Sequence, residues 1–114
     1  MNTCFTIDGD PGEIELISDV TAAIGLTATT YAPTSGLFKG MQARSVLIQI
    51  IGASANVTLN GTTPTITAGT DKGLTLTAGT NMVVSNPNAV INMKFINAVA
   101  AAAGTVKIKA QPFF

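Results

Sequence analysis

Histidine and tryptophan are absent from the 114-residue chain, and cysteine occurs once, as Cys4. Without histidine, the sequence lacks the commonest general base and the commonest metal ligand. A single cysteine allows no internal disulfide, which fits assembly in a reducing compartment. Cys4 also has no histidine that could activate it as a nucleophile. The composition therefore argues against an enzyme, and we expect no cofactor.

Acidic residues gather at the start of the chain, without the full pattern of a calcium loop. Asp8, Asp10 and Asp19 match positions 1, 3 and 12 of such a loop. The pattern also requires glycine at position 6 and glutamate at position 12, where this chain has Glu13 and Asp19. Pro11 stiffens the segment further. We therefore expect an acidic turn in water and no bound metal.

Charge is scarce, because only 11% of the residues are charged, against about 25% in typical soluble domains. The net charge is zero. All charge in residues 1–20 is acidic, whereas residues 21–114 carry all six basic residues and one aspartate. A surface of Thr, Asn, Ser and Gly is easily desolvated, which favours lasting contact with other subunits over a monomeric domain. The bases are scattered, so we expect no nucleic-acid partner.

Long apolar runs are missing as well. Residues 45–70 and 73–93 contain no charged residue, but Asn, Thr, Gly and Pro interrupt both stretches. Neither offers the roughly 18 consecutive apolar residues that a membrane-spanning helix needs. No apolar segment ahead of a cleavage site indicates secretion. We expect a protein without a membrane partner that is assembled in the cytoplasm.

Short alternating or β-branched segments dominate the chain from residue 44 onward. Val, Ile and Thr favour strands, and turn residues separate the segments. The expected strands are 44–51, 56–61, 62–67, 73–79, 80–85, 89–98 and 105–114. Pro64 places the third of these at an edge or a bulge, and Asn60-Gly61 is typical of a tight hairpin turn.

Alternation along these strands predicts which side chains face the core. The inward residues are Val57 and Leu59; Leu74 and Leu76; Ala89, Ile91, Met93 and Phe95; and Val106, Ile108 and Ala110. The outward residues include Thr58 and Asn60, Thr75 and Thr77, and Lys107 and Lys109.

The remaining segments are read less directly. Residues 13–24 fit a helix or a strand, whereas residues 25–31 are β-like by their Thr and Tyr content. Residues 32–40 are expected to form a loop whose Leu37 and Phe38 pack back onto the body. The Ala-rich residues 99–104 are too few for a stable helix, so we expect a loose hairpin loop there.

The tetrapeptide Thr-Ala-Gly-Thr occurs twice, at residues 67–70 and 77–80. Ten residues separate the copies, which matches one strand plus one turn, with Asp71 and Lys72 in the loop between. Together, these patterns predict an all-β fold: a single antiparallel β-sandwich or barrel-like domain of about seven to eight strands over residues 13–114. An extended acidic arm, residues 1–12, precedes it.

From Ala43 onward, the chain resembles small β-rich proteins encoded among the structural genes of tailed bacteriophages. The shared pattern comprises Ala43-Arg44, Val57–Leu59, the turn Asn60-Gly61-Thr62-Thr63-Pro64-Thr65, Gly73-Leu74 and Ala78-Gly79. The stretches GLTATTYAP and FINAVAAAAGTVKIKA fit the same pattern. The likeness covers about two-thirds of the chain and leaves out the acidic start, MNTCFTIDGDPGE.

This resemblance implies a structural role in the virion. Small β-sandwich proteins of phage heads often act as decoration, or cement, proteins that bridge neighbouring major capsid protein subunits. We accordingly expect contacts with the major capsid protein and with copies of the chain itself, as a homo-oligomer. The candidate contact residues are Phe5, Ile7, Asp8, Asp10, Phe113 and Phe114. The two terminal phenylalanines either anchor in a partner's groove or cover their own sheet.

Other roles stay open from the sequence. Within the virion, the chain could serve as a head–tail connector, a tail component or a fibre component. A module that binds carbohydrate or a host surface through Thr/Asn-rich loops is a further alternative, but the lack of tryptophan counts against aromatic sugar platforms. The usual catalytic constellations are missing, which disfavours an enzyme.

Overall fold

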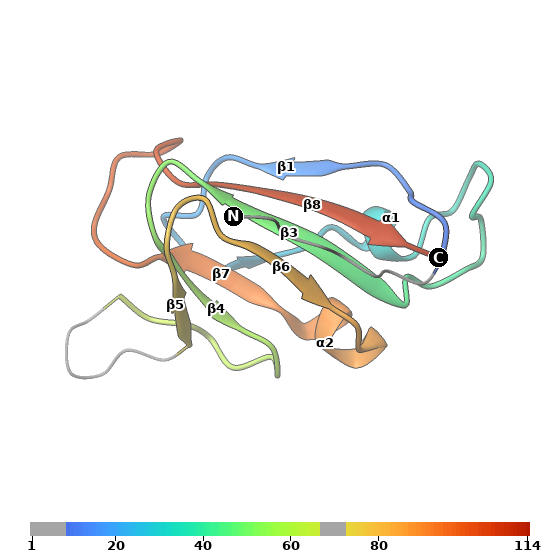
Figure 1. The fold of residues 1–114 in the computed structure, drawn as a ribbon. Coiled ribbons are helices and arrows are strands. Elements are labelled where there is room, and N and C mark those ends of the chain that lie inside the picture. The colour runs from blue at the N-terminus through green and yellow to red at the C-terminus, as the bar shows by residue number, and fades with distance from the viewer. Residues whose placement is uncertain (1–8, 67–72) are drawn as a thin grey trace.

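Eight strands form two four-stranded antiparallel sheets in the computed structural model, which describes residues 9–66 and 73–114. The first sheet has the order β1-β8-β3-β6 and the second the order β2-β7-β4-β5 (Figure 1). The strands are β1 Glu15–Ile17, β2 Ile24–Gly25, β3 Ser45–Ile51, β4 Ala55–Thr58, β5 Leu74–Leu76, β6 Asn81–Val84, β7 Lys94–Asn97 and β8 Lys107–Phe113. The helices are α1 Ala28–Tyr31 and α2 Pro87–Asn92. The all-β sandwich and the number of strands expected from the sequence are confirmed.

The core lies between the two sheets, and burial alternates most clearly in the two long strands, as was predicted for residues 105–114. Val46, Ile48 and Ile50 of β3 are buried, and so are Ile108 and Ala110 of β8. The lysines of β8 are exposed on the opposite face. Strands β3 and β8 pair along seven residues each, so the longest ladder of the fold sits over the centre of the core.

Consecutive strands often belong to different sheets. Among the described strands, only β4 and β5 are consecutive in the chain and in the same sheet; every other connection, including β3–β4 and β7–β8, crosses from one sheet to the other. The Ala-rich residues 99–104 therefore form no hairpin, because they carry the chain from β7 to β8; their non-helical conformation was predicted correctly. At the β3–β4 crossing Gly52 has a φ of +89°. A Cβ there would overlap the carbonyl oxygen of Thr105, so only glycine fits.

Two segments expected to be strands contain helix instead. Residues 25–31 form the end of the short β2 and then the single-turn helix α1. Residues 89–98 are divided between α2 and β7. Asn86 caps α2, since its Oδ1 accepts hydrogen bonds from the N–H groups of Asn88 and Ala89, at 2.9 and 3.3 Å, and Pro87 occupies the first turn. This Asn-Pro start is typical of a helix.

The helix α2 changes which side chains of that segment are buried. Val90, expected to face outward, is fully buried, whereas Ile91 is partly exposed. Met93 and Phe95 lie in the core as predicted. The strand pattern was therefore correct only for the second half of residues 89–98.

The outer face of β4 is buried, although alternation predicted that it would meet water. Asn56 and Thr58 are covered because the following loop folds over them. The Asn56 amide Nδ2 donates to the Thr65 carbonyl at 2.8 Å, and the Thr58 hydroxyl donates to the Thr62 carbonyl at 2.5 Å. Residues 62–66, expected to form a strand, make this cover instead, with Pro64 fully buried in it.

The edge strand β5 is less buried than predicted. Leu74 is 58% exposed and Leu76 is half-buried, because β5 is the last strand of its sheet. Asn60-Gly61 forms a turn, with Gly61 at a φ of +86°, but the residues between β4 and β5 are too many for a tight hairpin. Gly79 turns the chain between β5 and β6, as expected for the second Thr-Ala-Gly-Thr. The first copy, with Asp71 and Lys72, lies outside the described residues.

Candidate functional site

The described part of the N-terminal arm, residues 9–12, is paired with the end of β8. The backbone groups of Asp10 and Phe114 exchange two hydrogen bonds, of 2.8 and 2.9 Å. The Gly12 N–H donates to the Pro112 carbonyl at 2.8 Å. Residues 9–12 therefore extend the sheet beside β1 rather than leaving the body.

A β-bulge separates this pairing from β1. The partners on the two sides of the bulge are Gly12 with Pro112 and Glu15 with Ala110. Glu13 and Ile14 thus stand opposite the single residue Gln111. An extra residue of this kind bends the strand and changes the direction of its side chains. Without it, Gly12 and Glu15, three residues apart, would point to opposite faces of the sheet.

The side chain of Gln111 compensates for a missing donor at this place. Pro112 has no N–H, so it cannot donate to the carbonyl of Gly12, its partner across the ladder. The Gln111 amide Nε2 donates to that carbonyl instead, at 3.1 Å. Gly12 itself has little room for a side chain, since a Cβ would come within 2.6 Å of the Phe114 ring. The bulged pairing therefore depends on both neighbours.

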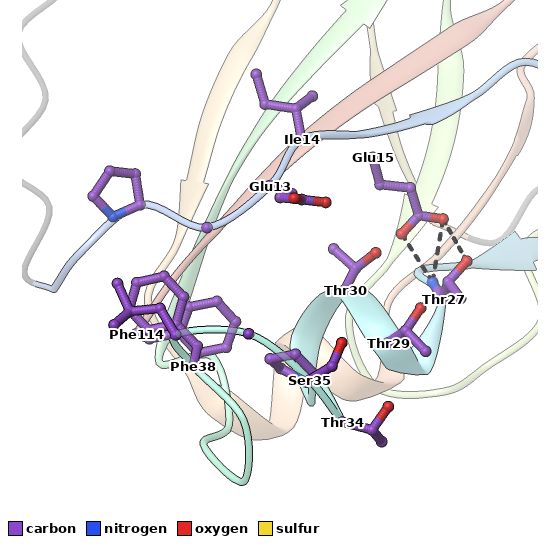
Figure 2. A pocket seen from close by; sticks show the side chains of 15 residues that line it. Glu13, Ile14, Glu15, Thr27, Thr29, Thr30, Thr34, Ser35, Phe38 and Phe114 are labelled. Carbon is purple, nitrogen blue, oxygen red and sulfur yellow. Dashed lines mark hydrogen bonds between the residues drawn. The ribbon is translucent and has the colours of Figure 1, made fainter.

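Glu15 joins the two sheets at this side of the sandwich. Its carboxylate accepts hydrogen bonds from the Thr27 N–H at 3.0 and 3.3 Å and from the Thr27 hydroxyl at 2.6 Å. Glu15 belongs to β1 of the first sheet, and Thr27 follows β2 of the second sheet and precedes α1. This contact fixes one wall of a groove, and Figure 2 shows its dashed bonds at the rim.

The groove lies between the bulged segment and the loop that contains α1, with a cavity volume of about 690 Å³. One wall consists of residues 11–15, and the other of Thr27, residues 29–30 and residues 33–38. Figure 2 shows the Glu13 carboxylate lying over the cavity, with threonine and serine hydroxyls on the opposite wall. Among the described residues, Glu13 has no hydrogen-bond or ion-pair partner. Its described lining residues include two carboxylates and no lysine or arginine, so the groove suits groups that donate hydrogen bonds or carry positive charge.

An aromatic pair closes one end of the groove. The rings of Phe38 and Phe114 stack with centroids 4.6 Å apart and an interplanar angle of 14°. Phe114 is buried, which favours the second of the two alternatives that the sequence left open for its ring, cover of its own sheet. Phe113 is half-buried on the outer face of β8. Phe38 packs back as predicted, whereas Leu37 is 88% exposed and does not.

The structure brings together only part of the predicted contact set. Asp10 and Phe114 are direct neighbours through their backbones, with the Asp10 side chain exposed. Phe5, Ile7 and Asp8 lie outside the described residues. The sequence interpretation missed Glu13, Glu15 and the α1 loop as parts of one groove, because the Glu15–Thr27 contact spans twelve residues and has no periodic signature.

Within residues 9–66 and 73–114, no helix has the length and apolar character needed to cross a membrane. Comparison of the chain with protein-family models, with curated proteins and with solved structures found no significant match.

Proposed function

We propose that the chain is a structural protein of a tailed-bacteriophage particle, a decoration (cement) protein that bridges major capsid protein subunits. The resemblance from Ala43 onward suggests this role, and the low charge of the chain suits a part held by neighbours. The all-β sandwich is compatible with it.

The observation that carries the proposal is the exposed apolar rim of the groove. Ile14 is 60% and Leu37 is 88% exposed, and both line the groove. Leu16 of β1, two residues after Ile14, is also largely exposed. Fully burying a leucine or isoleucine side chain contributes about 1.5–3 kcal/mol. A rim of this kind, around unpaired acceptor groups, favours contact with another protein.

A shell lattice presents the same partner site many times. A weak contact at one groove becomes strong attachment when a decoration protein engages several neighbouring subunits at once, because the second contact forms at a high effective concentration. A modest rim therefore suffices for a cement protein, although it would give a single partner only weak binding.

Electron cryomicroscopy of purified particles, with mass spectrometry for copy number, tests the location. Many copies spread over the capsid lattice would support a cement protein. A few copies at one vertex or along the tail would favour a connector, tail or fibre component instead. Absence from the particle would refute the structural role altogether.

A pair of variants tests whether the groove makes the contact. We expect Leu37→Asp to reduce rebinding to particles depleted of this protein, because the change places a charge on the apolar rim. Val99→Asp is the matched control, since Val99 is 64% exposed in the β7–β8 connection, outside the groove. Equal binding by both variants would remove the groove from the mechanism.

The groove also offers support for the carbohydrate-binding alternative. Its hydroxyls and the free Glu13 carboxylate are groups that hydrogen-bond sugars. Titration of the purified protein with soluble oligosaccharides, followed by amide chemical shifts, would detect this activity. Shifts confined to residues 11–15 and 27–38, together with absence from the particle, would favour a sugar-binding module over a cement protein.

A further inference from the structure

The two sides of the sandwich close in different ways. Glu15 of β1 is bonded to Thr27 beside β2, and residues 77–80 join β5 to β6, so the end strands of the two sheets lie together at each side. On the first side, the bulge and Glu13 directly precede β1, β1 begins with Glu15, and β2 has only two residues. Bulges, charges and short edge strands all block the addition of another strand.

The other side contains an edge without these defences. Strand β6 spans Asn81–Val84 and contains no charged residue and no proline; within residues 9–66 and 73–114 it pairs only with β3. Its four residues continue in regular register with β3. Strand β5, beside it, is an edge of three residues. Among the four end strands of the described residues, β6 is therefore the longest, and it combines this length with the lack of a bulge, a charge and a proline.

The hydrogen bonds around Ile50 determine which backbone groups of β6 face outward. Ile50 donates to the Thr80 carbonyl at 3.0 Å and accepts from the Gly79 N–H at 2.8 Å. In an antiparallel ladder, such doubly bonded residues alternate with residues whose groups point to the other side. Met82 and Val84 therefore bond to β3, and the N–H and C=O groups of Asn81 and Val83 point to the free edge.

We propose that the free edge of β6 pairs antiparallel with β6 of a second copy of this chain, about a two-fold axis near Met82. The backbone groups of Asn81 then bond to those of Val83 in the second copy, and the reverse. The first sheets of the two copies become one continuous sheet. The contact is isologous, since the same edge serves both copies.

Charge and closure favour a second copy over a foreign strand. When a strand pairs with its own copy, identical residues lie near one another, so a charged strand would repel itself. Strand β6 has no charged residue, and the net charge of the chain is zero. Because the defended β1 edge cannot continue the sheet, association stops at a dimer and does not propagate into a fibre. This inference does not depend on the capsid role.

The test uses the purified full chain in analytical ultracentrifugation over a range of concentrations. Wild type is expected to sediment as a monomer–dimer equilibrium. Val83→Pro removes only the outward N–H and leaves the β3 ladder intact. We expect it to raise the dimer dissociation constant by at least about tenfold, because both copies lose a donor. Val83→Thr, which keeps the N–H and a β-branched side chain, is the matched control.

Amide hydrogen exchange on wild type provides a second measurement that does not require the proline variant to fold. The amides of Asn81 and Val83 are expected to become more protected as the protein concentration rises, whereas exchange at the β1 edge stays constant. A monomer at every concentration would overturn the proposal. So would a dimer whose concentration-dependent protection lies elsewhere, or a folded Val83→Pro that dimerises like the control.

Discussion

Replacing Asn56 with alanine is expected to lower the free energy of unfolding by about 2–3 kcal/mol. Asn56 is 1% exposed on the outer face of β4. Its Nδ2 donates to the Thr65 carbonyl at 2.8 Å, and its Oδ1 accepts from the Thr75 hydroxyl at 2.6 Å. Each side-chain hydrogen bond contributes about 1 kcal/mol, and the space left by the side chain adds up to about 1 kcal/mol, because the loop above can partly collapse.

A loss of this size is measurable in a small domain, whose total stability is about 5–15 kcal/mol. Urea unfolding followed by far-ultraviolet circular dichroism suits this chain, which has one tyrosine and no tryptophan. For about 100 residues, the change corresponds to a fall in melting temperature of roughly 8–12 °C. We expect the denaturant slope m to stay constant, since the variant and the wild type expose similar amounts of surface on unfolding.

Asn88→Ala is the control for this experiment. Asn88 is exposed, so its replacement should change stability by less than about 0.5 kcal/mol. A double-mutant cycle with Thr75→Val should give a coupling of about 0.5–1.5 kcal/mol for the direct contact. If Asn56→Ala cost no more than the control, the loop over β4 would contribute nothing to stability, and the explanation of its buried polar face would be wrong.

Three further substitutions probe single features of the fold. Gly52→Ala should prevent folding or strongly lower the melting temperature, because the new Cβ would overlap a backbone carbonyl. Gly36→Ala, which has open space around it, should lower the free energy of unfolding by only about 1 kcal/mol. Equal losses in the two variants would contradict the assigned packing. Asn86→Ala should cost about 1 kcal/mol in urea unfolding through the lost cap of α2, and no loss would remove the capping role. Glu15→Ala should lower the free energy of unfolding by about 1 kcal/mol, because its partly exposed carboxylate accepts hydrogen bonds from Thr27 across the two sheets. Amide exchange in the α1 loop should then accelerate, and unchanged exchange would show that Glu15 does not hold this loop.

The asymmetry between the two sides of the sandwich gives the molecule two distinct surfaces. The β1 side carries an acidic groove with an apolar rim, and its bulge prevents strand addition. The β6 side exposes backbone groups on an uncharged strand. The two proposed contacts, one with the capsid and one with a second copy, therefore use different chemistry, and each can be removed without the other.

Local patterns identified the strands where burial follows a simple alternation. The run 44–51 and the segment 105–114 form the longest paired strands, with Ile108 and Ala110 inward as predicted and Ile48 buried opposite Ala110. These strands lie at the centre of the first sheet, where one face meets the core and the other does not. Period-two patterning is reliable under those conditions, because each side chain then reports the environment of its own face.

The same patterns failed where a loop or a helix covers the second face. Asn56 and Thr58 are polar and buried, since residues 62–66 supply their hydrogen-bond partners. The helix α2 was missed although Asn86-Pro87 is a recognisable start, because the β-branched and apolar residues that follow favoured a strand. Short segments of this kind are decided by packing more than by propensity.

The sequence by itself determined the class of this protein: an all-β chain with little charge, no histidine and a strand every ten residues or so. These properties are local or compositional, so they can be read without coordinates. Only the tertiary structure decided the division of the strands between two sheets, the bulge at Glu13 and Ile14, the bond from Glu15 to Thr27 and the open edge of β6. Each of these depends on which distant segment lies alongside, and that choice is made by the packing of the whole core.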